Sequence, residues 1–405
     1  MLTILSSFMD SIEERFLKKM DATSLGFVRS IIHKIRWEAR LIGIKGPRGV
    51  GKTTLLLQYI KQNLPLDHTT LYASLDNIWF AQNSLLDLVD DFVKKGGQHL
   101  FLDEVHKYPD WSVVLKNIYD DYPELKIVFT GSSMLEILNA RADLSRRAVI
   151  YHLQGLSFRE FVAIQTGHEF PTASLQDIVE NHVQLSRDIL AKIKPLAHFS
   201  KYLNGGYFPF FQEVPDLYHQ RLEEVVNMTL EIELPLLRKV DISYIPKLKQ
   251  LIQIISESVP FIPNVSKLSE RIGINRNTLV SYLFFLQEAH ITKNLYKDIK
   301  GITQMQKPEK IYLDNTNFQF AFTPKNADVG NLRETFFINQ VSYEHTVEYV
   351  KDGDFRVDRR YIFEVGGKNK TTEQIQGVKN SYIAADDIEY GNPKKIPLWL
   401  FGFMY

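Results

Sequence analysis

The sequence predicts an α/β protein in which a parallel-sheet domain comes first, a helical region follows, and a smaller α/β region lies near the C-terminal end. Three observations lead to this fold class. Between residues 40 and 103, short apolar runs alternate with stretches of helical period, which is the pattern of βαβ units. Residues 155–240 contain long amphipathic segments and few strand signals. Beyond residue 310, short apolar runs with acidic ends return beside a further helical stretch.

Composition narrows the class of protein. The chain has 405 residues, of which 44% are hydrophobic and 24% are charged, and this is the profile of a globular protein. That length exceeds one ordinary hydrophobic core, so we expect about two to four domains. Lys plus Arg and Asp plus Glu both number 48, so net charge gives no argument for a surface that binds nucleic acid or membrane as a whole. Contact with DNA would need a local basic patch.

Cysteine content and hydropathy bear on the compartment. The sequence contains no cysteine, which excludes disulfides, thiolate zinc sites and cysteine nucleophiles. No apolar run approaches the roughly 20 residues that span a bilayer. The acidic residues that soon follow the first apolar stretch are unlike a secretory signal. We therefore expect a cytoplasmic protein with no membrane contact.

The elements of the first domain follow from the same patterns. Short apolar runs bounded by turn residues predict strands, and longer amphipathic stretches predict helices. The predicted strands are residues 40–45, 69–74, 98–103, 126–130 and 147–153. The predicted helices are residues 53–63, 84–94 and 111–119.

The loop between the first strand and the first helix has the G-x-x-x-x-G-K-T spacing of a phosphate-binding loop. Its glycines let the backbone curl around phosphates and present amides at close range. Lys52 supplies a charge for the β and γ phosphates, Thr53 a hydroxyl for magnesium, and the helix its positive N-terminal end. The alternative is a glycine-rich turn that binds nothing. The residues predicted to bind nucleotide here are Gly46, Pro47, Arg48, Gly49, Val50, Gly51, Lys52, Thr53 and Thr54.

A second motif ends the third predicted strand. The apolar run at residues 99–102 leads into Asp103 and Glu104, which resembles a Walker B element. We expect Asp103 to hold magnesium through its water shell, and Glu104 to orient and polarise the attacking water. The alternative is a strand that ends in an ordinary polar loop. The glutamate favours hydrolysis over binding alone.

Polar residues follow the fourth predicted strand. The order of the two nucleotide motifs resembles that of the additional-strand NTPases, whose next strand usually ends in a polar sensor. That resemblance makes Thr130 and Ser132 candidates for sensing the γ-phosphate of the nucleotide. Ser132 and Ser133 could instead cap a helix over residues 134–138. The sequence leaves both interpretations open.

Basic residues come next along the chain. Arg147 is the first choice for an arginine that neutralises the phosphates of a neighbouring copy, ahead of Arg141 and Arg146. The alternative is a solvated surface arginine. A role in trans would require an oligomer.

Together these motifs resemble a known family. Gly-Pro-Arg-x-x-Gly-Lys-Thr-Thr, Phe-Leu-Asp-Glu, Thr-Gly-Ser-Ser and the Leu-Ser-Phe-Arg-Glu-Phe of residues 156–161 look like prokaryotic AAA+-type P-loop ATPases that carry a C-terminal domain of unknown function. The resemblance continues at residues 205–209, 330–336 and 363–368, so it covers almost the whole chain. One predicted strand lies between the two nucleotide motifs, as in the additional-strand NTPases that include the AAA+ ATPases. The resemblance implies ATP and magnesium as cofactors.

The patterns and the resemblance divide the chain into parts. The predicted parts are a P-loop AAA+ ATPase core with an N-terminal helical segment at residues 1–154, a helical lid-like region at 155–240, a winged-helix domain at 241–315 and a nuclease-like α/β domain at 316–405. Gly205 and Gly206 are expected to mark a bend in the lid-like region. A plain helical linker is the alternative to a lid.

A helix-turn-helix pattern lies within residues 263–295. A short helix that ends at Gly273 and a second one that begins near Asn275 match it, and later β-type residues would supply a wing. The candidate contacts to DNA phosphates and base edges are Lys267, Arg271, Arg276 and Asn277. Contact with a protein is the alternative, because winged helices serve both uses.

The C-terminal part is similar to a PD-(D/E)XK nuclease core, in which carboxylates gather a magnesium ion. The candidate residues for that degenerate site are Glu334, Asp358, Glu364 and Lys368. The family pattern has lysine two residues after the glutamate, and that position is Gly366 here. Lys368 could swing in across the glycine pair. The departure argues against cleavage and for a fold that is retained for structure or binding.

These inferences lead to one hypothesis with two rivals. We expect an ATPase whose nucleotide state repositions the winged helix and the C-terminal domain relative to DNA or a protein partner. The first rival is a module that holds ATP or ADP without turnover. The second is a nuclease gated by the ATPase.

Overall fold

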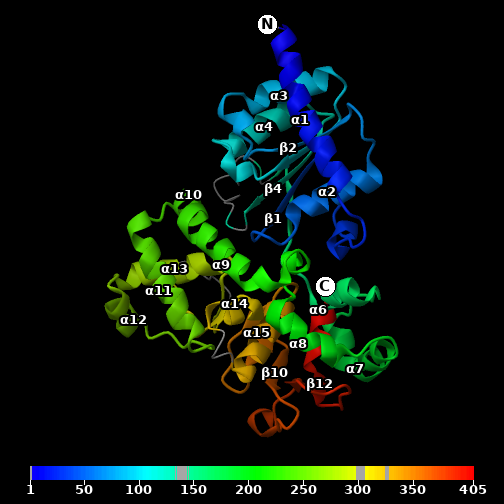
Figure 1. The fold of residues 1–405 in the computed structure, drawn as a ribbon. Helices are drawn as coiled ribbons and strands as arrows, with labels where there is room; N and C mark the ends of the chain where they lie inside the picture. The colour runs from blue at the N-terminus through cyan, green and yellow to red at the C-terminus, as the bar shows by residue number, and fades with distance from the viewer. Residues whose placement is uncertain (1, 133, 135–143, 145, 298–305, 324–327) are drawn as a thin grey trace. The chain divides into compact units, whose positions relative to one another are not determined.

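The computed structural model describes residues 2–132, 134, 144, 146–297, 306–323 and 328–405 (Figure 1). The chain divides into two compact units, Met1–Gln154 and Gly155–Tyr405. Within the described residues, no helix is both long enough and apolar enough to cross a bilayer.

The first unit is built on one parallel sheet. Its strands are β1 (Leu41–Gly46), β2 (Thr70–Ser74), β3 (His99–Asp103), β4 (Lys126–Ser132) and β5 (Val149–His152). Their order across the sheet is β2-β3-β4-β1-β5, and every pair is parallel. The predicted parallel-sheet α/β class is confirmed. This order puts the carboxyl ends of β1, β3 and β4 side by side at one edge of the sheet.

Helices cover the sheet on both faces. They are α1 (Leu2–Ala22), α2 (Lys52–Asn63), α3 (Leu85–Lys94) and α4 (Trp111–Asp121). The chain passes from β1 through α2 to the far edge and then returns through α3 and α4. Because such crossovers are right-handed, α2 and the α3–α4 pair lie on opposite faces (Figure 1). The side chain of Ser84 caps α3 by accepting from two backbone amides of its first turn.

The second unit begins with the helices that the sequence predicted for residues 155–240. They are α6 (Phe158–Thr166), α7 (Leu175–Leu190), α8 (Pro195–Gly205), α9 (Tyr218–Met228) and α10 (Leu234–Arg238). The predicted bend is the end of α8, where a Cβ on Gly206 would lie 2.7 Å from the Cα of Tyr202. Asn317 secures the following turn, since its amide donates to the carbonyl of Leu203 and accepts from the backbone N–H of Tyr207.

Three helices and a two-stranded antiparallel sheet follow. They are α11 (Ile245–Ser256), α12 (Val265–Ile272), α13 (Arg276–Glu288), β6 (Thr292–Leu295) and β7 (Lys310–Leu313). Gly273 ends α12 with a φ of 69°, and Asn275 caps α13 through the amide of Thr278. These are the elements that the helix-turn-helix pattern predicts. The assignment as a winged helix stays a prediction.

A mixed sheet closes the second unit. Its strands, in spatial order, are β12 (Lys395–Pro397), β11 (Ser381–Ala385), β10 (Tyr361–Gly366), β9 (Phe355–Val357) and β8 (Val347–Glu348). β10, β11 and β12 pair in parallel, whereas β8, β9 and β10 pair antiparallel. The remaining helices are α14 (Thr316–Phe322) and α15 (Val329–Val341). Phe337 of α15 packs its ring on Phe355, Phe363 and Phe401, which fixes the helix on the sheet.

The last residues of the chain return to the start of this unit. The carbonyl of Tyr405 accepts from the hydroxyl of Ser157 at 2.7 Å and from the guanidinium of Arg159 at 3.0 Å. The motif at residues 156–161 and the C-terminal part therefore share one core.

Candidate functional site

Tight packing explains the glycines of the predicted phosphate loop. Gly49 and Gly51 have φ values of 83° and 94°, a region that side chains with a Cβ rarely adopt. A Cβ on Gly46 would lie 1.9 Å from the carbonyl oxygen of Leu153. The loop thus joins β1 to α2 by a path that only glycine permits at these positions.

Lys52 folds back into this loop. Its ammonium donates to the carbonyls of Gly46 at 2.8 Å and Pro47 at 3.0 Å, and the residue is only 7% exposed. The charge is therefore held at the centre of the loop, within reach of any group that the loop encloses.

Three sequence-predicted residues meet at one carboxylate. Asp103 is 2% exposed, and its Oδ2 accepts from the hydroxyl of Thr53 at 2.6 Å. Its Oδ1 accepts from the hydroxyl of Thr130. These groups come from β3, from the start of α2 and from β4. The sheet order brings together what the sequence keeps far apart.

Sequence reasoning missed a third partner of Asp103. The hydroxyl of Tyr72 on β2 donates to Oδ2 at 2.8 Å. Burial first, and the charge of Asp103 second, raise the pKa of Tyr72 well above its ordinary value, so the hydroxyl keeps its proton. A tyrosine in a strand otherwise reads as an apolar core residue, and no signal in the sequence pointed to this contact.

Glu104 sits in a strained backbone conformation. Its φ is 55°, which is uncommon for a residue with a Cβ and costs about 1–3 kcal/mol where it persists. Its amide donates to the hydroxyl of Thr130 at 3.1 Å. The turn directs the Glu104 carboxylate to within 3.5 Å of Nε2 of His106.

His106 was also missed by sequence reasoning. Burial, together with the positive charges of Lys107 and Lys52, lowers the pKa of His106 to about 3. The ring is therefore neutral at physiological pH. The 3.5 Å contact between His106 and Glu104 is therefore not an ion pair.

Two other candidates lie differently. Ser132 Oγ accepts from the amide of Met134 at 3.4 Å. Residues 135–138 of the helix that it was expected to cap lie outside the described part of the chain, so sensing and capping both stay predictions. Ser133 falls outside the described residues, as does Arg141. The guanidinium of Arg147 donates two hydrogen bonds to the carboxylate of Asp120, from Nε at 2.9 Å and from Nη2 at 3.0 Å.

The candidate DNA contacts lie on the surface of the second unit. Lys267 and Arg271 are exposed one turn apart on the same face of α12, and Arg276 and Asn277 are exposed in the first turn of α13. The residues that join β6 to β7 include 298–305, which lie outside the described part of the chain.

A carboxylate cluster occurs in the C-terminal part, with a membership that differs from the predicted one. Glu334 on α15 accepts from the hydroxyl of Tyr312 at 2.7 Å, and Lys310 lies 3.7 Å from Asp354 and 4.0 Å from Glu334. Burial first, and the neighbouring Asp354 second, raise the pKa of Glu334 to about 7. Burial also raises the pKa of Glu364.

The prediction that Asp358 belongs to this cluster is wrong. Asp358 and Arg359 form the tight turn between β9 and β10, with φ values of 50° and 57°. That turn points the Asp358 carboxylate to His345 at 2.6 Å and to the amide of Thr346 at 3.0 Å. Asp354, at the other end of β9, takes its place.

The prediction that Lys368 swings in to Glu364 is also wrong. Lys368 pairs with Asp387 at 3.0 Å in solvent. Lys370 reaches Glu364 at 2.5 Å instead, because its aliphatic stem crosses directly over Gly366, where a Cβ would lie 2.8 Å from the Lys370 Cγ. The glycine that breaks the nuclease pattern is thus the residue that makes room for this lysine.

The side chains that could bind a metal ion lie mostly apart from one another in the described residues. No group of three or more His, Asp or Glu side chains in these parts of the chain is arranged to hold a metal ion. The donors at Thr53 and Asp103 are one hydroxyl and one carboxylate, which suit a magnesium ion whose other ligands are water and phosphate oxygens. The chemistry of the residues present fits that ion at the first unit.

Part of the chain matches a known family model, and most of it matches a curated relative. Residues 38–162 match the family model described as "AAA domain". A protein of Methanocaldococcus jannaschii, named only as uncharacterized protein MJ1637, is 24% identical over 387 residues, which are 88% of this chain and 81% of that protein.

Two solved structures are among the similar folds. PCH-2 of C. elegans has a TM-score of 0.25 at 16% identity and covers 43% of this chain and 48% of its own. AMPPCP-bound DnaA of Aquifex aeolicus has a TM-score of 0.25 at 13% identity, over 64% of this chain and 84% of its own. At these TM-scores neither likeness carries an argument. Residues 38–162, which include all five strands of the sheet ordered β2-β3-β4-β1-β5, are thus similar to an AAA domain, a similarity that implies binding and hydrolysis of ATP.

Proposed function

We propose that this chain binds ATP with magnesium in residues 1–154, hydrolyses it, and uses the nucleotide state as a switch for a partner bound by residues 155–405. The observation that carries the proposal is the meeting of Thr53, Thr130 and Asp103 at one buried carboxylate beside the loop that holds Lys52. A purely structural loop has no need for these groups from three separate segments.

Each residue has a distinct role in the proposed reaction. The loop amides and Lys52 bind the β and γ phosphates, and the ammonium exchanges its carbonyl partners for phosphate oxygens. Thr53 and Asp103 hold magnesium, which when bound neutralises charge on those phosphates. Glu104 orients and polarises the attacking water, with Thr130 fixing its backbone amide.

The neutral ring of His106 supports this role of Glu104. An imidazolium at 3.5 Å would pair with the carboxylate and weaken it as a base, whereas the neutral ring of His106 adds no positive charge there. Arg147 is partly exposed, and its pair with the exposed Asp120 contributes about 0–1 kcal/mol. That small energy lets Arg147 exchange Asp120 for the phosphates of a neighbouring copy.

Steady-state phosphate release tests the proposal. Wild type should release phosphate in a magnesium-dependent manner, and Lys52→Ala should abolish both release and nucleotide binding. Glu104→Gln should keep nucleotide binding and lose release by about a hundredfold or more. Binding without release in wild type would instead establish the non-catalytic module, and a Lys52→Ala protein as active as wild type would refute the assignment.

DNA is the partner that the exposed residues of α12 and α13 favour. If they contact phosphates, binding to duplex DNA should weaken with salt, and Lys267→Ala with Arg271→Ala should reduce the slope of log K against log salt by about two. Lys249→Ala is a matched control, because Lys249 is exposed in the same unit and pairs with Glu231 at 2.7 Å. No binding to duplex at low salt would leave a protein as the partner.

We propose no nuclease activity. Lys370 and Lys310 already neutralise carboxylates of the C-terminal cluster, so that the site has the charge balance of a structural network. Incubation of plasmid DNA with wild type and magnesium should give no cutting. If wild type cuts the plasmid and Glu364→Ala abolishes the cutting, the proposal that the chain has no nuclease activity is wrong.

A further inference from the structure

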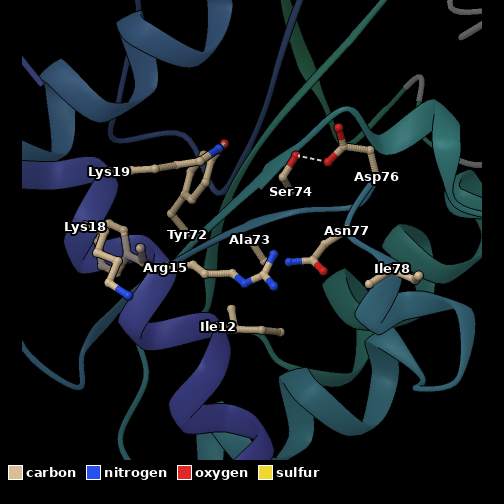
Figure 2. Close-up of a pocket in the computed structure, with 11 residues that line it drawn as sticks. Ile12, Arg15, Lys18, Lys19, Tyr72, Ala73, Ser74, Asp76, Asn77 and Ile78 are labelled. Carbon is tan, nitrogen blue, oxygen red and sulfur yellow. Dashed lines mark hydrogen bonds between the residues drawn. The ribbon is translucent and has the colours of Figure 1, made fainter. Parts of the chain in front are cut away.

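A pocket of about 490 Å³ lies between helix α1 and the end of strand β2 in the first unit. Figure 2 shows side chains of α1 on one wall and those of residues 72–78 on the other. Lys19 extends from α1 along the ring of Tyr72, and its ammonium lies near the tyrosine hydroxyl (Figure 2). Lys19 lines the pocket and is an exposed residue.

A chain of hydrogen bonds runs from this pocket to Asp103. The Lys19 ammonium donates to the Tyr72 hydroxyl at 3.1 Å, and that hydroxyl lies 2.8 Å from Asp103 Oδ2. An ammonium can only donate and an ionised carboxylate can only accept. Tyr72 must therefore accept from Lys19 and donate to Asp103, so the direction of both bonds is fixed by chemistry.

Packing holds the middle member of this chain in place. Tyr72 is 3% exposed, and the ring of Phe16 from α1 stacks on it with centroids 6.1 Å apart. The Lys19 ammonium lies 4.9 Å from the centre of the Tyr72 ring. Helix α1 thus fixes the tyrosine by an aromatic stack and a cation at once.

We propose that Tyr72 and Lys19 are positioning residues for the magnesium-holding carboxylate of Asp103, and that they act in series, so that helix α1 is a working part of the metal site. This inference rests on the proposed function. Oδ2 has two hydroxyl donors, and Thr53 is itself a candidate ligand of the ion. Tyr72 donates to Oδ2 and thereby orients the carboxylate of Asp103. Lys19 in turn polarises and orients the hydroxyl of Tyr72.

Magnesium titration of nucleotide binding tests the proposal without relying on turnover. The readout is the magnesium concentration at half-maximal binding of a fluorescent ATP analogue. Tyr72→Phe keeps the stacked ring and removes the hydroxyl, and it should raise that concentration about tenfold. Lys19→Met should raise it in the same direction, and Lys19→Arg should restore it.

Series action gives a specific signature. Adding Lys19→Met to Tyr72→Phe should cause no further change, because Lys19 acts on Asp103 only through the missing hydroxyl. Lys18→Met is the matched control: Lys18 lines the same pocket but pairs with Glu14 at 2.6 Å, so the titration should stay as in wild type.

Several results would overturn the inference. They are an unchanged titration for Tyr72→Phe, a Lys19→Met effect that persists in the Tyr72→Phe background, or an equal shift for Lys18→Met. Thermal unfolding without magnesium checks that each variant folds. If Tyr72→Phe does not fold, the comparison of Lys19→Met with Lys19→Arg decides whether the inference holds. Wild type that binds no analogue at any magnesium concentration would refute the proposed function itself.

Discussion

Glu334 offers a test of the electrostatics in the C-terminal cluster. Its side chain is 18% exposed, and burial and Asp354 raise its pKa from an ordinary 4.5 to about 7. One pKa unit corresponds to about 1.4 kcal/mol. The ionised form of Glu334 therefore opposes folding by about 3 kcal/mol once the pH exceeds 7.

The sign follows from proton release. In the unfolded chain the carboxyl of Glu334 loses its proton near pH 4.5, whereas in the folded protein it keeps it until about pH 7. Unfolding between these values releases a proton, so the free energy of unfolding falls as the pH rises from 4.5 to 7. The contribution is fully present below pH 4.5 and lost above 7.

Glu334→Gln should remove this dependence. The glutamine oxygen can still accept from the hydroxyl of Tyr312, and no charge remains to be buried. Urea unfolding of wild type and variant at pH 4.5 and pH 8 measures the effect. The variant should gain about 3 kcal/mol relative to wild type between the two values.

Two further variants make the test specific. Glu309→Gln changes an exposed carboxylate nearby and should give the same difference from wild type at both pH values. Asp354→Asn removes the second cause of the raised pKa, so in that background the gain from Glu334→Gln should shrink. A gain that does not change with pH would refute the reasoning.

Three other predictions follow from packing and charge. Gly46→Ala should destabilise the first unit by about 1–3 kcal/mol and weaken ATP binding, because its Cβ would meet a backbone carbonyl oxygen at 1.9 Å. Urea unfolding and nucleotide titration measure the two effects. Gly26→Ala is the control, because the nearest atom to its Cβ would be 3.4 Å away. Asn317→Ala should cost about 3 kcal/mol in urea unfolding, since the 0% exposed amide donates to two carbonyls and accepts from an amide and a hydroxyl. If Arg147 acts on the nucleotide of a neighbouring copy, Arg147→Ala should lower ATP turnover at least tenfold without changing ATP affinity. In that case the turnover of wild type per chain should also rise with protein concentration. Equal turnover in variant and wild type would make Arg147 a surface residue without that role.

Much of the first unit could be predicted because its signals are local. The strands end within a few residues of their predicted limits, as β3 at Asp103 illustrates. The loop from Gly46 to Thr53 is contiguous, and its glycines are dictated by backbone angles and by one close contact. Pattern and structure agree where a few neighbouring residues decide the conformation.

The second unit shows where such reasoning fails. The spacing of carboxylates after residue 350 predicted Asp358 and Lys368, but the directions of side chains depend on turns. The tight turn at Asp358 sends its carboxylate outward, and the turn after Gly366 brings Lys370 to Glu364. Sequence spacing does not encode the direction in which a chain leaves a strand.

The sequence by itself determined the α/β class, the glycine-dependent loop from Gly46 to Thr53 and the placing of Asp103 and Glu104 at the end of β3. Each of these depends on residues that are adjacent in the chain. Only the tertiary structure decided what surrounds Asp103. Tyr72 reaches it because β2 pairs with β3 in a register that sets Ser74 opposite Asp103. Lys19 reaches Tyr72 because α1 packs on β2. These contacts join segments that are far apart along the chain, and no local sequence pattern marks them. Burial and the order of strands in the sheet bring the segments together, whereas local propensity does not.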